Sequence, residues 1–327
     1  MLQNEENKKI CVIGGGSWGE NHIKALYRMD NLGGIVENNP KRLQEIVEKY
    51  KPVKGYNRIE DALDYGYDGY VVATPAETHF EIGSILLAKK QNVLMEKPLS
   101  LFSLDSLKLV RMSEEYQSRL MVGHLMLFHP AIIKIKELID EGKIGDLRYV
   151  YSNRLNLGKV RTEESALWSL APHDISIFNY LVGKYPETIN ASGGCFLQSG
   201  IEDTVLACYS YPGNIKAHIF VSWLHPFKEH RLTVVGSKAM LVYEDSSPEK
   251  NILYYDSGFE LIDKKPVKRE KPAQVILYEP SSPLDNELSY FIEHLDSEIS
   301  VASGKSGHEV VKILEKTDEC LHSCQGS

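Results

Sequence analysis

A glycine-rich turn near the N-terminus most constrains the fold of this chain. Gly14, Gly16 and Gly19 follow the apolar run 10–13 and open a helix-like stretch, 19–29. In a strand–turn–helix unit, the first glycine permits a tight turn and the second lets backbone N–H groups approach a pyrophosphate. The third lets helix and strand pack closely. Because the helix N-terminus attracts anions, the unit predicts a dinucleotide-binding fold.

Glu37 extends this prediction to the ribose. It ends a second apolar run, 33–36, and lies 18 positions beyond Gly19. An acid about 20 residues after the glycines binds the ribose hydroxyls and disfavours a 2′-phosphate, so NAD is the predicted cofactor. The alternative is a solvated carboxylate at a strand end. Lys41 and Arg42 lie close by in the sequence, so NADP is disfavoured but stays open.

Composition narrows the class of protein. A chain of 327 residues predicts about two domains, and a net charge of −8 without a basic block argues against nucleic-acid or anionic-membrane partners. Five scattered cysteines without paired spacing indicate reduced packing thiols and no metal site, with Cys320 and Cys324 as an alternative redox pair. The polar start 1–9 and the lack of a long apolar stretch predict a cytoplasmic protein.

The first part of the chain alternates short apolar runs with amphipathic stretches. We expect strands at 10–13, 34–37, 69–73, 93–96 and 120–123, and helices at 19–29, 40–49, 77–89 and 103–116. Strands joined by helices of this length predict an α/β fold with a doubly wound parallel sheet. Its ligand crevice is expected at the carboxyl ends of the strands.

The later part of the chain has a different pattern of predicted helices and strands, which indicates a second domain. We expect helices at 131–141, 172–182, 285–295 and 308–321, and strands at 147–157, 189–197, 203–211, 215–224, 231–235 and 240–243. The pattern indicates an α+β domain with a large open, mainly antiparallel sheet. The predicted division is 1–124 and 125–327, with the last helix returning towards the first domain.

Two residues are candidates for proton chemistry. Lys97 follows the strand 93–96, and Pro98 biases it to an extended backbone that projects the ammonium outward. Pro172 suits the first position of a helix, which would place His173 in the first turn beside the positive dipole end and favour neutral imidazole. Asp174, if close, works in the opposite sense. Each residue also has an alternative without a catalytic role. Lys97 would then be a solvated lysine at a strand end, and His173 a structural or surface histidine.

Two further segments are candidate ligand contacts. Thr74, Pro75 and His79 follow the strand 69–73, where a turn borders the nicotinamide or simply begins a helix. The segment 154–161 carries four polar side chains, which suit an acidic or phosphorylated ligand or form a solvated basic loop. They are Arg154, Asn156, Lys159 and Arg161.

Taken together, the glycine turn, Ala73–Thr74–Pro75 with His79, Glu96–Lys97–Pro98 and His173 resemble the Gfo/Idh/MocA family of oxidoreductases over nearly the whole chain. The resemblance implies a Rossmann domain, a C-terminal domain whose open sheet mediates homodimers or homotetramers, and a cofactor held between them. It implies that Lys97 anchors the reacting hydroxyl and that His173 is the acid/base. Many members carry an aspartate four residues before this histidine, where this chain has Ser169.

Within the family, segments 167–177 and 222–228 are most similar to the branch that oxidises nucleotide-linked amino sugars at C3. The resemblance thus implies oxidation of a UDP-linked N-acetylhexosamine or its uronic acid. A cyclitol or keto-sugar oxidoreductase and a non-catalytic sensor are the alternatives. The predicted cofactor-binding residues are Gly14, Gly16, Ser17, Trp18, Gly19, Glu37, Thr74, Pro75, His79, Glu96 and Lys97. The predicted substrate-binding residues are Lys97, Arg154, Asn156, Arg161 and His173.

Overall fold

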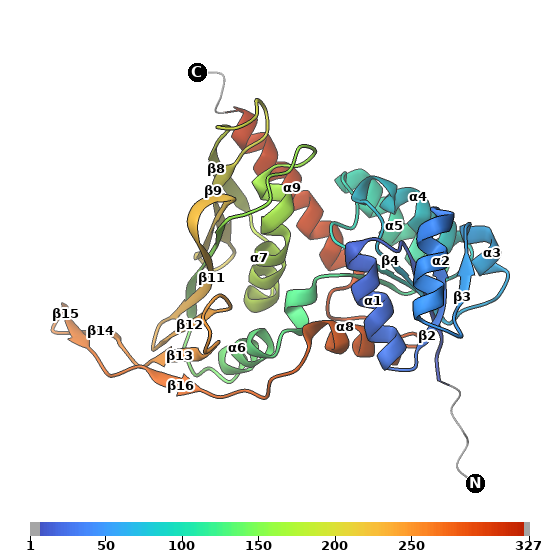
Figure 1. The fold of residues 1–327 in the computed structure, drawn as a ribbon. Coiled ribbons are helices and arrows are strands. Elements are labelled where there is room, and N and C mark those ends of the chain that lie inside the picture. The colour runs from blue at the N-terminus through green and yellow to red at the C-terminus, as the bar shows by residue number, and fades with distance from the viewer. Residues whose placement is uncertain (1–6, 324–327) are drawn as a thin grey trace, which may run out of the picture. The chain divides into compact units, whose positions relative to one another are not determined.

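The chain divides into two compact units in the computed structural model, which describes residues 7–323 (Figure 1). The first unit comprises the chain up to Leu125 together with Ser282–Val311. The second comprises Met126–Ser281 together with the residues from Lys312 onward. Among residues 7–323, no helix combines the length and apolar character needed to cross a membrane.

The first unit is built on a six-stranded parallel sheet of order β3-β2-β1-β4-β5-β6, the order of a doubly wound nucleotide-binding fold. Its strands are β1 (Ile10–Ile13), β2 (Leu32–Val36), β3 (Lys54–Tyr56), β4 (Gly69–Val72), β5 (Val93–Met95) and β6 (Leu120–Val122). All residues of β1, β4, β5 and β6 are buried, as in a parallel sheet covered on both faces. The predicted fold of this part is confirmed.

Helices cover the sheet, and all but the last of those named next lie between its strands in the sequence (Figure 1). They are α1 (Ser17–Arg28), α2 (Pro40–Lys49), α3 (Ile59–Leu63), the short 3₁₀ helix η1 (Ala76–Thr78), α4 (His79–Ala88), α5 (Ser103–Glu115) and α8 (Pro283–Glu293). Asn39 caps α2 by accepting a hydrogen bond from the Arg42 N–H at 3.1 Å. Arg28 on α1 forms an ion pair with Asp285 on α8 at 2.5 Å, which helps to hold α8 in this unit.

The second unit contains an eight-stranded mixed sheet of order β16-β13-β12-β11-β7-β10-β9-β8, in which only β7 and β10 pair in parallel. Its strands are β7 (Leu147–Leu157), β8 (Thr188–Gly194), β9 (Thr204–Tyr211), β10 (Ile215–Ser222), β11 (Leu224–Gly236), β12 (Met240–Glu244), β13 (Ile252–Tyr255) and β16 (Gln274–Ile276). This confirms the predicted large, mainly antiparallel sheet.

One face of this sheet is covered by helices, and the other is open. α6 (Pro130–Asp140), α7 (Ala166–Val182) and part of α9 (Gly304–Ser323) lie on the covered side (Figure 1). The 3₁₀ helix η2 (Leu125–Phe128) precedes α6. A separate hairpin, β14 (Gly258–Ile262) and β15 (Lys265–Arg269), extends away from the sheet with Phe259 and Leu261 exposed.

The described cysteines do not form a disulfide in this fold. Cys11, Cys195 and Cys208 carry free thiols, and burial raises the pKa of the Cys11 thiol. The Cys320 Sγ contacts the carbonyl oxygen of Ile189 at 3.5 Å. Cys324 lies outside the described residues, so the alternative pair with Cys320 stays a prediction.

Candidate active site

The turn after β1 places its three glycines in three different surroundings. Gly14 has a φ of +100°, and a Cβ there would lie 2.7 Å from the carbonyl oxygen of Ala73. A Cβ on Gly19 would lie 2.0 Å from the carbonyl oxygen of Gly14. A Cβ on Gly16 would meet nothing within 4 Å, and no side chain caps α1 there. The fold therefore requires the first and third glycines, while the second faces open space that suits a diphosphate.

Glu37 follows β2 and lies against this turn. Its Oε2 accepts a hydrogen bond from the Gly15 N–H at 2.8 Å, and its Oε1 accepts one from the Asn39 N–H at 2.9 Å. The carboxylate is therefore fixed beside the glycine turn at the carboxyl edge of the sheet. A carboxylate in this place accepts hydrogen bonds from ribose hydroxyls and repels a 2′-phosphate.

Arg42, which the sequence offered as a contact for a 2′-phosphate, is engaged by the protein itself. Its Nε donates to the Gly15 carbonyl oxygen at 3.0 Å, and its Nη2 donates to Glu20 Oε2 at 2.6 Å. Hydrogen bonds from Lys49 and Arg42 hold the pKa of Glu20 below its usual value. Of the two cations near Glu37, only Lys41 is exposed.

His79 ties together two loops at the carboxyl edge. Its Nε2 lies 2.9 Å from the carbonyl oxygen of Thr74, and its Nδ1 lies 2.8 Å from that of Pro98. Burial lowers the pKa of His79, and a neutral imidazole donates to only one of the two carbonyls. The Thr74 hydroxyl contacts that of Thr78 at 2.7 Å. The geometry makes His79 a support for both loops, and its contact with a cofactor stays a prediction, as do those of Thr74 and Pro75.

Glu96 and Lys97 directly follow the carboxyl end of β5. Glu96 Oε1 accepts hydrogen bonds from Trp18 Nε1 at 2.6 Å and from His22 Nε2 at 2.7 Å. Its Oε2 accepts one from the Lys97 N–H at 3.1 Å. The Glu96 carboxylate is thus bonded within the protein, although the sequence suggested a cofactor ligand. Lys97 itself is half-buried at the edge where the crevice was predicted.

The helix that carries His173 begins earlier than predicted. α7 starts at Ala166, so Pro172 lies inside the helix and His173 lies about two turns from its start. The Ala166 N–H donates to the carbonyl oxygen of Glu202 at 2.8 Å, which anchors the helix start there. Because the dipole effect is confined to the first turn, the prediction that the helix N-terminus keeps His173 neutral is wrong. Ser169 lies one turn before His173 on the same helix face.

An ion pair fixes α7 against β7 directly beside His173. Arg154 on β7 binds Asp174 on α7 in bidentate fashion, with Nε–Oδ2 and Nη2–Oδ1 distances of 2.6 and 3.1 Å. The Ser152 hydroxyl donates to Asp174 Oδ1 at 2.5 Å. The Asp174 side chain is 2% exposed and that of Arg154 is 12% exposed. Arg154 therefore positions the helix of His173, and its contact with a substrate stays a prediction.

The other predicted substrate residues lie at and beyond the end of β7. The Asn156 Oδ1 atom is buried and has no hydrogen-bond partner among the described residues. Arg161 and Lys159 are exposed, and Arg161 Nε lies 3.6 Å from Glu164 Oε1. These three side chains remain candidates for a polar, anionic ligand.

Sequence reasoning missed His22 and Ser152. His22 donates a hydrogen bond to the Glu96 carboxylate, and Ser152 donates one to the Asp174 carboxylate. His22 is separated from Trp18 by one helical turn, so both face Glu96 from α1. That spacing was a usable signal. Ser152 had none, because its contact with Asp174 depends on how β7 and α7 pack.

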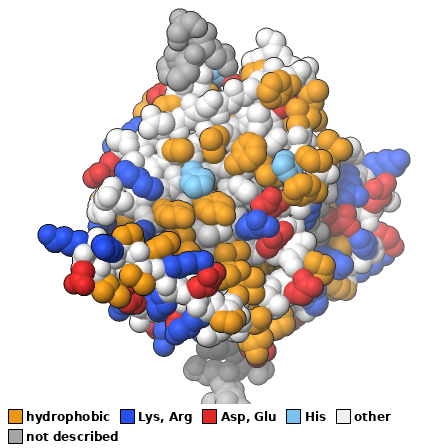
Figure 2. Space-filling view, turned by 90° about the vertical axis from the view of Figure 1, so that its left-hand side faces the viewer, with side chains coloured by type: hydrophobic (Ala, Val, Ile, Leu, Met, Phe, Trp, Pro, Cys, Tyr) orange, Lys and Arg blue, Asp and Glu red, His pale blue; other side chains and the backbone are white. Residues whose placement is uncertain are grey.

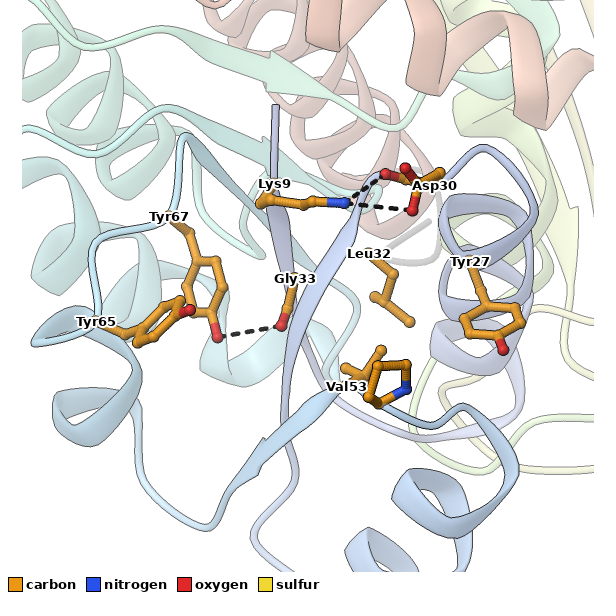
Figure 3. A pocket seen from close by; sticks show the side chains of 9 residues that line it. Lys9, Tyr27, Asp30, Leu32, Gly33, Val53, Tyr65 and Tyr67 are labelled. Atoms are coloured by element: carbon orange, nitrogen blue, oxygen red, sulfur yellow. Dashed lines mark hydrogen bonds and ion pairs between the residues drawn. The ribbon is translucent and has the colours of Figure 1, made fainter. Parts of the chain in front are cut away.

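A cavity of about 520 Å³ lies at the other edge of the first sheet (Figure 3). It is lined by Lys9 before β1, by Leu32 and Gly33 in β2, and by tyrosine rings that include Tyr67. The Tyr67 hydroxyl donates to the Gly33 carbonyl oxygen at 3.2 Å, and Lys9 Nζ donates to that of Asp30 at 2.7 Å. Because doubly wound sheets bind ligands at the carboxyl ends of their strands, this cavity is not the predicted cofactor site.

Two family models match the chain, one in each part. Residues 8–124 match the model described as "Oxidoreductase family, NAD-binding Rossmann fold". Residues 132–242 match the model described as "GFO/IDH/MocA C-terminal domain". The cofactor class predicted from the glycine turn and Glu37 agrees with the first of these.

Curated relatives are similar at low identity. The UDP-N-acetylglucosamine 3-dehydrogenase of Acidithiobacillus ferrooxidans is 27% identical over 183 residues, which is 56% of each chain. The matched part therefore spans little more than half of that relative. The inositol 2-dehydrogenase of Rhizobium meliloti is 22% identical over 96% of each chain.

Solved structures share the fold over the whole length. That of UDP-N-acetylglucosamine 3-dehydrogenase GnnA from Acidithiobacillus ferrooxidans has a TM-score of 0.85 at 20% identity, covering 98% of this chain and 99% of the other. An oxidoreductase from Agrobacterium radiobacter in complex with NAD+, L-tartaric acid and magnesium has a TM-score of 0.80 at 18% identity, covering 98% and 97%. At these identities the likeness concerns the fold.

Proposed function

Because this chain belongs to the Gfo/Idh/MocA oxidoreductase family, we propose that it catalyses the NAD-dependent oxidation of a sugar ring hydroxyl. One observation carries the proposal. The dinucleotide turn, open at Gly16, and Lys97, anchored through Glu96 to the helix that follows this turn, belong to the same carboxyl edge of one sheet. A cofactor site and a proton-active group thus occur together.

The described residues fit NAD. The open space at Gly16 and the uncapped start of α1 suit the pyrophosphate, and the Glu37 carboxylate suits the ribose hydroxyls. When bound, NAD supplies the hydride acceptor for the oxidised carbon. The residues of the chain supply binding, orientation and proton transfer.

In the proposed reaction, Lys97 and His173 act on the same hydroxyl. The Lys97 ammonium donates a hydrogen bond to the hydroxyl oxygen and stabilises the negative charge that develops there. A ring nitrogen of His173 accepts the hydroxyl proton as the alcohol becomes a ketone. The buried Arg154–Asp174 pair holds the helix segment of His173. It does not replace the aspartate that many members of the family carry at the position of Ser169, so the residue that orients the imidazole is not assigned.

The proposed substrate is a UDP-linked N-acetylhexosamine or its uronic acid. The relative from Acidithiobacillus ferrooxidans, whose name specifies UDP-N-acetylglucosamine, supports this choice. The exposed cations Lys159 and Arg161 and the unpartnered Asn156 Oδ1 suit an anionic, hydroxyl-rich ligand. Inositol is the second candidate, because an inositol 2-dehydrogenase matches over 96% of each chain.

A substrate panel tests the proposed function. We expect UDP-N-acetylglucosamine or its uronic acid to give a kcat/KM at least about tenfold above that of myo-inositol. The reason is that a substrate lacking the matching polar groups leaves hydrogen-bonding side chains of the site unpaired. The measurement is NADH absorbance with purified protein and NAD. A higher kcat/KM for myo-inositol would select the second candidate, and no NADH with any compound would refute a sugar dehydrogenase.

We also propose that the open face of the large sheet joins copies of this chain into a dimer or tetramer. Figure 2 looks onto this side, where hydrophobic side chains are interspersed with charged ones. Strand register aligns an uncovered row across the sheet, in which Tyr151 stacks on His218 with ring centroids 4.9 Å apart. Cys208 and Val242 continue this row, with Val242 reached through Thr233, which is only 8% exposed, and Leu206 is 45% exposed beside the row.

The interface proposal predicts a change of mass. The double variant Tyr151→Glu/Leu206→Glu is expected to shift the protein from oligomer to monomer, because two carboxylates would lose their hydration in the buried interface. Size-exclusion chromatography with light scattering measures this shift. Tyr65→Glu, an exposed aromatic of the first unit, is the matched control and should leave the mass unchanged. A monomeric wild-type protein would contradict the proposal.

A further inference from the structure

We propose that Trp18 and His22 are positioning residues for Lys97 and that they act through the carboxylate of Glu96. The inference rests on the proposed function for the catalytic role of Lys97. Its structural basis lies entirely within the first unit, so it can be tested without a sugar substrate.

The two donors come from one face of α1. Trp18 and His22 are one helical turn apart, and their rings meet edge to face with centroids 6.0 Å apart. Both direct a ring nitrogen to the same oxygen, Glu96 Oε1, at 2.6 and 2.7 Å. His22 is fully buried, whereas Trp18 is 43% exposed. Two side chains of α1, the helix that begins at the glycine turn, therefore donate hydrogen bonds to the same oxygen of Glu96.

The other oxygen of Glu96 holds the backbone of Lys97. Oε2 accepts the Lys97 N–H at 3.1 Å, and the Glu96 side chain is only 12% exposed. Gly123, directly after β6, has no side chain and so leaves room for the Glu96 carboxylate. A Cβ on Gly123 would lie 3.0 Å from both oxygens of Glu96. With three internal donors and this close backbone, the carboxylate is an anchor, with little surface left for a ligand.

Glu96 is the ionised carboxylate at the centre of this cluster. Burial raises the pKa of Glu96, but the hydrogen bond and charge of His22 and the hydrogen bond of Trp18 outweigh it, so the pKa is lowered. Glu287 on α8 is fully buried, and its burial and the nearby Glu96 raise its pKa well above the usual value. Burial lowers the pKa of His124 to about 4. At neutral pH Glu96 is therefore ionised and His124 is neutral, and burial shifts Glu287 towards its protonated form.

These contacts link cofactor binding to the placement of the lysine. α1 begins at the turn that faces the pyrophosphate, and the same helix fixes the peptide of Lys97 through Glu96. Removing a donor frees the Glu96 carboxylate to rotate and lets the Lys97 backbone move. A displacement of about 1 Å at a reacting group costs about 10²-fold in rate.

His22→Leu and His22→Gln form the test pair. Leucine removes the donor at similar volume, whereas the glutamine amide restores an N–H towards Glu96. We expect His22→Leu to lower kcat about 10²-fold with little change in the KM for the sugar. His22→Gln should recover most of the loss. Trp18→Phe, at an exposed position that carries little folding risk, should lower kcat in the same direction.

Two readouts need no sugar. Acetic anhydride labelling of Lys97, followed by peptide mass spectrometry, should be faster in His22→Leu than in wild type and near wild type in His22→Gln. Calorimetry should show weaker NAD binding in His22→Leu only. If the wild type oxidises no sugar, the proposed function fails and these readouts still decide the inference. Unchanged labelling and NAD affinity in a folded His22→Leu, or equal losses in both variants, would overturn it.

Discussion

Replacing Lys97 by methionine, or His173 by asparagine, is expected to lower kcat about 10²–10⁴-fold while NAD still binds. Methionine keeps an unbranched side chain but removes the ammonium that stabilises the developing oxyanion. Asparagine keeps hydrogen-bonding capacity but does not accept the hydroxyl proton as a base. The glycine turn and Glu37 are untouched in both variants. Steady-state kinetics and NAD titration by calorimetry measure the two effects separately.

Lys89→Met is the matched control for this experiment. Lys89 is exposed just beyond α4, in the same unit as Lys97, so its loss should leave kcat and NAD affinity unchanged. Near-normal turnover in both Lys97→Met and His173→Asn would refute the proposed proton transfer. Loss of NAD binding in Lys97→Met would instead show that the lysine serves the cofactor alone.

Most of the first sheet was predictable because of where its strands lie. β1, β4, β5 and β6 are buried on both faces and therefore read as continuous apolar runs between helices. β3 escaped prediction because this short edge strand contains Lys54, Gly55 and Tyr56 and is largely exposed. The hairpin of β14 and β15 escaped for the same reason, since it packs into neither sheet and shows no buried alternation.

The candidate site was predictable where its signals are local. The glycines and Glu37 follow from spacing along one strand–turn–helix unit, and the structure gives each glycine the expected surroundings. Pro172 misled the prediction of where α7 starts. The helix begins at Ala166, and the proline lies inside it. The role of Arg154 depends on a contact across 20 residues of sequence with Asp174, which composition does not encode.

Arg154→Met is expected to destabilise the protein by about 3–5 kcal/mol, because it leaves the buried carboxylate of Asp174 without its partner. The Ser152 hydroxyl alone does not compensate a charge whose side chain is 2% exposed. Urea unfolding followed by fluorescence measures the loss. If Arg154 only bound the substrate, its removal would instead raise the KM for the sugar and leave the free energy of unfolding unchanged.

The double variant Arg154→Met/Asp174→Leu separates these two roles. Removing both charges eliminates the unpaired carboxylate, so stability should return to near the wild-type value, since an apolar pair often replaces a buried ion pair at little cost. If kcat stays low in the stable double variant, the pair positions His173 as well as stabilising β7 against α7. If kcat also recovers while KM stays high, Arg154 contacts the substrate directly. A single Arg154→Met variant as stable as wild type would contradict the structural role of the ion pair.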